Sequence, residues 1–117
     1  MTTNYDDMSD FEVNSKISSI VHTNCFHLGG NGNGVFVSKS TDRYDLVNIK
    51  NSNFDPCNNP SDAWPIIVNN KISIDFWGEL WGADIQCDYE IAFEHEDRNP
   101  LRAAMICLLK SKGFENG

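Results

Sequence analysis

The sequence predicts an α+β domain in which helices pack on one face of a largely antiparallel four-stranded sheet. Two segments, one near each end of the chain, carry apolar residues at helical spacing, and four shorter segments have strand-like patterns. With a short helix in the middle, the order is α-β-β-α-β-β-α, which is typical of an α+β fold. The chain has 117 residues, 40% of them hydrophobic. We therefore expect one compact domain over residues 9–117, after a disordered tail at residues 1–8.

The first helix is predicted at residues 10–23. The run Ser9-Asp10-Phe11-Glu12 has the form of a capping box, in which the Ser9 hydroxyl accepts a hydrogen bond from the backbone near Glu12. Apolar residues then recur on one side of the segment and polar residues on the other, so one face of the helix should pack on the sheet.

A segment rich in glycine and asparagine, Gly29–Gly34, separates this helix from the first two strands. A phosphate-binding loop of this kind has a strand before the glycines and a helix after them. Here a β-type run follows, so we interpret the segment as a turn. The two strands are predicted at residues 35–38 and 44–49, with a turn at Thr41–Arg43 between them.

A loop dense in turn-forming residues, 53–62, leads to a short helix predicted at residues 64–70. Pro65 suits the first turn of a helix, where the N–H that proline lacks has no helical partner, and Asn70 suits its end. Because tryptophan is costly to expose, we expect Trp64 to lie in the core.

The second pair of strands is predicted at residues 71–77 and 83–93, joined by a hairpin over Gly78–Gly82. Apolar residues occupy every second position in both segments. Each strand should therefore bury one face and expose the other, which carries acidic residues.

The last helix has the clearest boundaries in the chain. Asn99 is a capping residue, Pro100 occupies the first helical position, and Gly113 follows the end. Lys110 and Lys112 lie in the last turn, where positive charge complements the helix dipole.

The overall charge excludes several classes of protein. Seventeen acidic against nine basic side chains give a net charge of −8, which is the wrong sign for holding a phosphate backbone, so we expect no direct nucleic-acid binding. No apolar run approaches the ~20 residues of a membrane-spanning helix, and the acidic start lacks the features of an export signal. We expect a cytoplasmic protein whose four scattered cysteines are buried free thiols.

The acidic residues are concentrated within residues 75–97, a stretch without Lys or Arg. Such a stretch either keeps the domain in solution or faces a basic partner. Trp81 lies beside Leu80 in the predicted hairpin, where it either packs over the sheet edge or contacts a protein partner. The predicted partner-binding residues are Asp84, Asp88, Glu90, Glu94, Glu96, Asp97, Trp81 and Leu80.

Four residues are candidates for metal binding or catalysis: His22, Cys25, His27 and His95. The Cys25-x-His27 spacing is not a recurrent zinc pattern, and the acidic stretch lacks the residue order of a calcium loop. No nucleophile elbow or zinc-protease motif occurs. We therefore expect no metal, no cofactor and no catalytic residues, and an enzyme built on these four residues is the alternative.

The segments Asp10–Asn14, Asp55–Ile67, Lys71–Ile74 and Asn99–Met105 together resemble the NinX-like family of small phage and prophage proteins of unknown function. The run Asn-Pro-Leu-Arg-Ala-Ala-Met at the start of the last helix is the most specific part of the resemblance. The resemblance implies a phage-encoded accessory protein made inside an infected bacterium, and it supplies no catalytic residues.

Size, charge and this resemblance favour a non-enzymatic accessory protein that binds a host or phage protein. Because an acidic surface can imitate nucleic acid, the expected partner is a nucleic-acid-binding complex, for instance a host defence complex that the protein inhibits. The alternatives are a small metal- or ligand-binding enzyme and a homo-oligomeric structural domain, such as a homodimer, that pairs through the Trp77–Trp81 hairpin.

Overall fold

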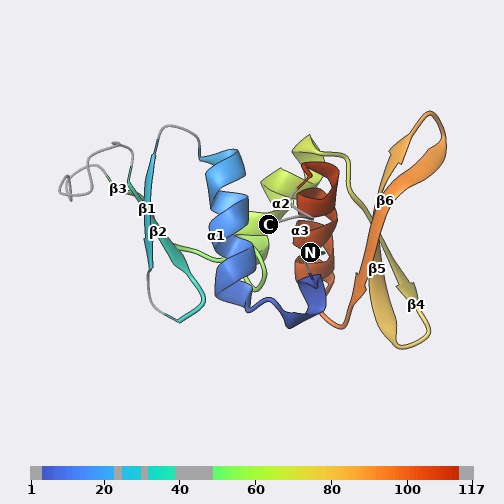
Figure 1. The fold of residues 1–117 in the computed structure, drawn as a ribbon, viewed down its shortest axis with the longest axis horizontal. Helices are drawn as coiled ribbons and strands as arrows, with labels where there is room; N and C mark the ends of the chain where they lie inside the picture. The colour runs from blue at the N-terminus through green and yellow to red at the C-terminus, as the bar shows by residue number, and fades with distance from the viewer. Residues whose placement is uncertain (1–3, 23–24, 30–31, 39–48, 114–117) are drawn as a thin grey trace.

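A computed structural model describes residues 4–22, 25–29, 32–38 and 49–113 (Figure 1). Within these ranges the elements are η1 (Tyr5–Asp7), α1 (Asp10–Val21), β1 (Phe26–Gly29), β2 (Val35–Ser38), β3 (Ile49–Phe54), α2 (Pro60–Asn69), β4 (Ser73–Trp77), β5 (Leu80–Cys87), β6 (Glu90–Asp97) and α3 (Pro100–Ser111). The strands form two antiparallel sheets, β1-β2-β3 and β4-β5-β6. The α-helices lie between the two sheets (Figure 1).

The prediction of an α+β fold is confirmed, but the prediction of a single four-stranded sheet with helices on one face is wrong. Each predicted pair of strands gains a third strand and becomes a separate sheet. Helix α1 packs on β2, α3 packs on β5 and β6, and the two helices contact each other. Because the helices fill the space between the two pairs of strands, the pairs do not join edge to edge.

The first sheet contains a strand that the sequence pattern did not indicate. Strand β1 lies before the glycine-rich segment and pairs along its length with β2, while β2 agrees with the strand predicted at residues 35–38. Strand β3 begins at Ile49, where the predicted strand at 44–49 ends, and residues 44–48 lie outside the described ranges. Its sequence, IKNSNF, lacks alternation, so pairing with β2 rather than local pattern defines it.

In the second sheet, the strand predicted at residues 83–93 is divided in two. Strand β5 ends at Cys87 and β6 begins at Glu90, with Asp88 and Tyr89 in the turn between them. Both turn residues have positive φ angles, 54° and 69°, as in a type I′ hairpin. A two-residue turn switches which alternate positions face each side of the sheet, and the register shift between Ile85 and Gln86 restores the original order from Phe93 onward. The alternation in the sequence therefore runs through the turn without a visible break.

The hairpin predicted at residues 78–82 is present, but its turn is shorter. Trp77 pairs directly with Leu80, so only residues 78–79 lie in the turn. The glycine there has a φ of 65°, which glycine adopts without steric cost. Residues 80–82 therefore belong to β5, and this assignment decides which side of the sheet each of them occupies.

Helices α1 and α3 begin where the sequence predicts. The backbone N–H of Glu12 donates to Oγ of Ser9 at 3.1 Å, as in a capping box. The backbone N–H of Leu101 donates to Oδ1 of Asn99 at 2.9 Å. Local side-chain capping thus sets the start of both helices.

Helix α2 starts at Pro60, four residues before the predicted start, and Asn59 caps it. Pro65 consequently lies inside the helix rather than in its first turn. The buried side of α2 carries Ala63 and Ile66, and Trp64 lies away from it with 63% of its surface exposed. The expectation of a core Trp64 is therefore wrong.

The hydrophobic core is built around α3. Residues 103–109 of this helix are all buried, and they belong to one cluster with Val13 and Ile17 of α1 and Val35 and Val37 of β2. Helix α3 is apolar nearly all round because α1 lies on one side of it and the second sheet on another. Among the described helices, none is long and apolar enough to cross a membrane.

The N-terminal segment, predicted to be a disordered tail at residues 1–8, packs on the core from its first described residues. The side chains of Tyr5 and Met8 are buried. Asn4 caps the 3-10 turn η1 by accepting a hydrogen bond from the backbone N–H of Asp6. The prediction is wrong for residues 4–8, because contacts distant in sequence hold a segment that has no periodicity of its own.

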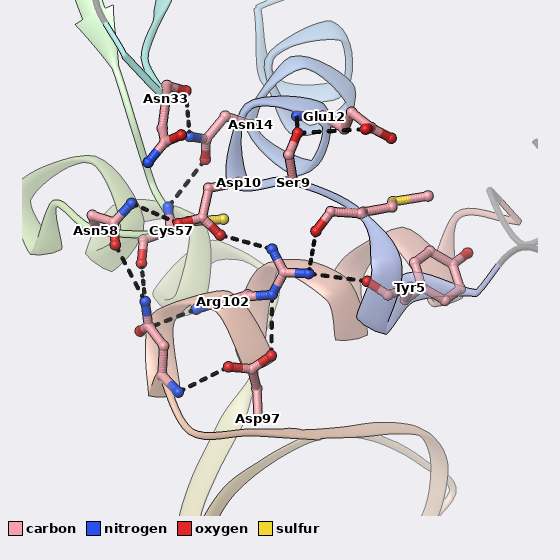
Figure 2. A network of polar contacts seen from close by, with 12 residues as sticks. Tyr5, Ser9, Asp10, Glu12, Asn14, Asn33, Cys57, Asn58, Asp97 and Arg102 are labelled. Atoms are coloured by element: carbon pink, nitrogen blue, oxygen red, sulfur yellow. Dashed lines mark hydrogen bonds and ion pairs between the residues drawn. The ribbon is translucent and has the colours of Figure 1, made fainter.

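Arg102 of α3 provides those distant contacts (Figure 2). Its Nη2 donates to the carbonyl oxygens of Tyr5 and Met8 at 3.0 and 2.6 Å. Its Nη1 donates to Asp10 at 2.7 Å and its Nε to Asp97 at 3.0 Å. This side chain, which is 10% exposed, joins the N-terminal segment, α1 and the end of β6. We call this cluster the Arg102 junction.

Two asparagines extend the polar network beside the junction. Asn14 of α1 is fully buried, donates to the carbonyl of Asn33 and to Asp55, and accepts from the backbone N–H of Cys57. Asn99 donates to the carbonyl of Cys57 at 2.6 Å. These bonds satisfy buried polar groups that would otherwise destabilise the fold.

Candidate partner-binding site

The strand register places different side chains on the two sides of the β4-β5-β6 sheet. Residues paired across strands share a side, and successive residues alternate. The row Ile74–Ala83–His95 lies on the inner side, where Ala83 and His95 are buried. The outer side carries the carboxylates of Asp75, Asp84, Glu94 and Glu96, with Gly82 between them and Trp77 at one end. We call these six residues the acidic face.

The acidic face is hollowed. A concavity of about 420 Å³ is lined by these residues together with neighbouring parts of β5 and β6. Gly82 stands between Asp75 and Glu96 in one cross-strand row. A Cβ at Gly82 would have its nearest neighbour at 3.8 Å, an ordinary contact. Packing therefore does not require this glycine, and the absent side chain leaves space between two carboxylates.

The negative charge of the acidic face is not neutralised by the described part of the chain. None of its carboxylates forms an ion pair there, and Lys110 donates to the backbone carbonyl of Glu94 instead. Asp84 lies directly opposite Glu94, and such like-charged pairs destabilise a sheet. Oδ1 of Asp84 is also buried without a hydrogen bond among the described residues, an arrangement that costs free energy.

Aromatic surface lies beside this charge. Trp77 has 74% of its surface exposed, and Phe76, on the other side of the same strand, has 56% exposed. Strand β4 pairs only with β5 among the described strands, so it forms an edge of the sheet. Exposed aromatic residues on an unpaired edge strand are typical of surfaces that bind another chain.

Three of the eight residues predicted to contact a partner lie together on the acidic face: Asp84, Glu94 and Glu96. Leu80 pairs with Trp77 and so lies on the same side of the sheet. Asp88 and Glu90 lie at the turn between β5 and β6, beyond the concavity. The structure thus brings half of the predicted residues to one surface.

Trp81 and Asp97 lie on the opposite side. They pair with each other across β5 and β6. The ring of Trp81 is half-buried, 5.1 Å from that of Phe76, and Asp97 binds Arg102. Because the turn has only two residues, Trp81 belongs to β5 and pairs with Phe76, and Trp77 rather than Trp81 lies beside the carboxylates.

Sequence reasoning missed Asp75 and Trp77 as members of this site. The signal was present, because these residues and Ser73 alternate with the apolar positions of the strand. Trp77 was not assigned to the polar side because its own side chain is apolar.

The four candidates for metal binding or catalysis are dispersed. The ring of His22 packs on Phe54 at 4.7 Å, near the first sheet, whereas His95 belongs to β6 of the second. Cys25 is half-buried, and the side chain of His27 lies outside what the structure describes. His22 and Cys25 take part in no metal-ligand cluster of three or more groups among the described residues.

The cysteines are free thiols in different environments. Cys57 and Cys107 are buried, as predicted, whereas Cys25 is half-buried and Cys87 is exposed. Burial raises the pKa of the Cys57 thiol well above its usual range, and it raises the pKa of Cys107 to about 11. Thiols with raised pKa values are poor nucleophiles, so these two cysteines have a packing role.

Fold and surface together define a small acidic α+β protein in which one side of a sheet carries carboxylates and an exposed tryptophan. The model of the family described as Bacteriophage P22, NinX matches residues 4–112. The chain therefore belongs to this phage protein family, and the resemblance noted in the sequence is confirmed. A search of curated proteins found no significant match.

Proposed function

We propose that this phage protein is a non-enzymatic accessory factor that binds a basic surface of a host or phage protein through its acidic face. Such binding would take place in the cytoplasm of the infected bacterium. The observation that carries the proposal is the placement of the exposed Trp77 beside carboxylates that no described cation neutralises. A surface of this kind gains free energy when a basic partner covers it.

The concavity suits a long basic side chain. An arginine or lysine that enters above Gly82 would place its charge between Asp75 and Glu96. A guanidinium at this end of the sheet can also stack on the indole of Trp77.

The partner class follows from the charge. Proteins that bind nucleic acid present clustered Lys and Arg to the phosphate backbone. Rows of carboxylates on a rigid sheet can bind these basic residues in place of nucleic acid. We therefore propose inhibition of a nucleic-acid-handling complex, such as a host defence complex. The acidic face needs to imitate only the phosphate backbone and not the bases, because phosphate contacts position a nucleic acid without reading its base sequence.

The test uses the full-length protein as bait in lysate of infected host cells at low and at moderate salt. We expect a nucleic-acid-binding complex to be retained at low salt and released as salt increases. The double variant Asp84→Lys/Glu94→Lys and the single variant Trp77→Ala should each abolish retention. Retention that is independent of salt, or unchanged in both variants, would contradict the proposal.

Two matched control variants test whether binding depends on the acidic face itself or on any exposed negative charge or tryptophan. Asp7→Lys reverses an exposed charge on η1, and Trp64→Ala removes an exposed tryptophan on α2. Both control variants should retain the partner as the wild type does. Circular dichroism of each variant verifies that the fold is intact.

A second candidate function is self-association through the edge of β4, where Phe76 and Trp77 are exposed. Pairing two copies at this edge would complete the backbone hydrogen bonds of the strand. It would also bring two acidic faces close together, which opposes pairing at low salt. Sedimentation velocity measures the fraction of dimer at each salt concentration. A dimer fraction that increases with salt would support this candidate, and a monomer at all salt concentrations would exclude it.

A further inference from the structure

A second group of ionisable side chains lies on the inner side of the second sheet, away from the acidic face. His95 and Asp97 are two residues apart on β6 and so share a side, and Asp6 reaches them from η1. One ligand-type atom from each of the three residues lies within 4.8 Å of the other two. An imidazole with two carboxylates is a donor set that suits divalent transition-metal ions.

The imidazole of His95 packs edge-on against the ring of Tyr5. Its side chain is 8% exposed, and its Nε2 is buried without a hydrogen bond among the described residues. This nitrogen lies 3.3 Å from Oδ1 of Asp6. Burial, with the nearby charge of Lys110, lowers the pKa of His95. The neutral imidazole is the form that binds a metal.

The distances suit a tetrahedral ion. Metal–ligand bonds of about 2.0–2.1 Å at tetrahedral angles place two ligand atoms about 3.3 Å apart, which matches the separation of Nε2 of His95 and Oδ1 of Asp6. The side chain of Asp6 is 71% exposed, so it can adjust to complete the geometry.

The third residue is held in place by neighbouring donors. The backbone N–H of Asn99 donates to Oδ1 of Asp97 at 2.9 Å, and Nε of Arg102 donates to Oδ2 at 3.0 Å. Outer hydrogen bonds of this kind orient the carboxylate ligands of metal sites. Each oxygen keeps a further lone pair, so these bonds leave the carboxylate able to bind an ion.

We infer that Asp6, His95 and Asp97 form a binding site for a divalent transition-metal ion, with Zn²⁺ as the probe ion. Three protein ligands leave the fourth position to water. The ion attaches η1 to β6, and it supplies the buried nitrogen of His95 with a partner. Lys110 opposes binding by its charge, although its ammonium group is hydrogen-bonded to the carbonyl of Glu94.

The test titrates the reduced, full-length protein with Zn²⁺ in competition with a chromogenic chelator. We expect one Zn²⁺ per chain, and a loss of affinity of about ten-fold or more in Asp6→Asn. Asp7→Asn is the matched control on the same turn and should bind as the wild type does. His95→Gln should also lose binding, with circular dichroism verifying its fold.

Two spectroscopic readouts identify the ligands. Zn²⁺ should shift the Nε2 resonance of His95 in ¹⁵N NMR, and Co²⁺ should give a spectrum without a sulfur-to-metal charge-transfer band. A sulfur band would assign the ion to the free cysteines and overturn the inference. The same conclusion would follow if the wild type bound no Zn²⁺, or if Asp6→Asn and Asp7→Asn bound it equally.

Discussion

The Arg102 junction and the acidic face use carboxylates in opposite ways. At the junction, Asp10 and Asp97 each accept a hydrogen bond from one largely buried guanidinium. On the acidic face, no carboxylate has a cationic partner among the described residues, and Asp84 even faces Glu94. The difference shows that the acidic residues of this chain divide into a set that holds the fold together and a set that the fold presents to its surroundings.

The largest effect is expected from breaking the junction with Arg102→Met. This variant removes the only cation that the structure places against Asp10 and Asp97 in the described chain, and it removes one hydrogen-bond donor from each of the carbonyl groups of Tyr5 and Met8. Removing one partner of a buried ion pair costs about 3–5 kcal/mol. Urea unfolding followed by circular dichroism measures the loss.

The control for this variant is Lys112→Met, which removes an exposed cation just after α3 and should change the free energy of unfolding very little. Equal stability of Arg102→Met and Lys112→Met would show that the junction does not hold the N-terminal segment. The division of the carboxylates into a set that stabilises the fold and a set that faces the surroundings would then be wrong.

A smaller loss is expected from Asn14→Ala beside the junction. The backbone N–H of Cys57 and the carbonyl of Asn33 would lose their buried partner. An unsatisfied buried polar group costs about 1–3 kcal/mol. The same urea experiment measures this change, and Asn58→Ala, at an exposed position of the network, should cost less.

The pH dependence of stability gives a third test, at His95. Burial lowers the pKa of His95 in the folded protein below the ordinary value of 6.5. The unfolded chain therefore binds a proton that the folded protein does not, and stability falls as pH decreases through 6.5 toward the lowered pKa. Unfolding at pH 7 and at mildly acidic pH should show a smaller loss in His95→Gln than in the wild type. An identical pH dependence in the two proteins would contradict the buried neutral imidazole.

The smallest effect is expected on the acidic face, and it has the opposite sign. Glu94→Gln removes the repulsion between Glu94 and Asp84, so it should stabilise the fold by about 0.2–1 kcal/mol. Thermal unfolding at low salt is the measurement, and added salt should reduce the gain. If this variant destabilised the protein, the acidic face would contribute to the fold as the junction does.

The local elements were largely predictable because their signals act within a few residues. Ser9 and Asn99 cap helices through hydrogen bonds to backbone groups two or three positions away. Gly78 marks a tight turn through its own backbone conformation, which has a positive φ angle. The turn at Asp88 and Tyr89 was missed because it uses neither glycine nor a break in the apolar pattern.

The candidate site was only partly predictable, because a shift of one position in a strand moves a side chain to the other side of the sheet. Glu94 and Glu96 were predicted to bind a partner because acidic residues are concentrated in this stretch, although both lie beyond the strand predicted at residues 83–93. The length of the hairpin turn then decided that Trp77 joins them and Trp81 does not. No pattern within the hairpin specifies that length, since two-residue and longer turns both accept its glycines.

By itself, the sequence determined the phage family, the α+β class, the helix starts and the concentration of negative charge in one stretch of the chain. The tertiary structure decided that there are two sheets, that the N-terminal segment packs on the core, and that Asp97 binds Arg102 while Asp84 lies opposite Glu94. The physical reason is the range of the interactions. Capping and periodicity act between near neighbours, whereas Arg102 reaches Asp10 and Tyr5 across 92 and 97 positions of the chain.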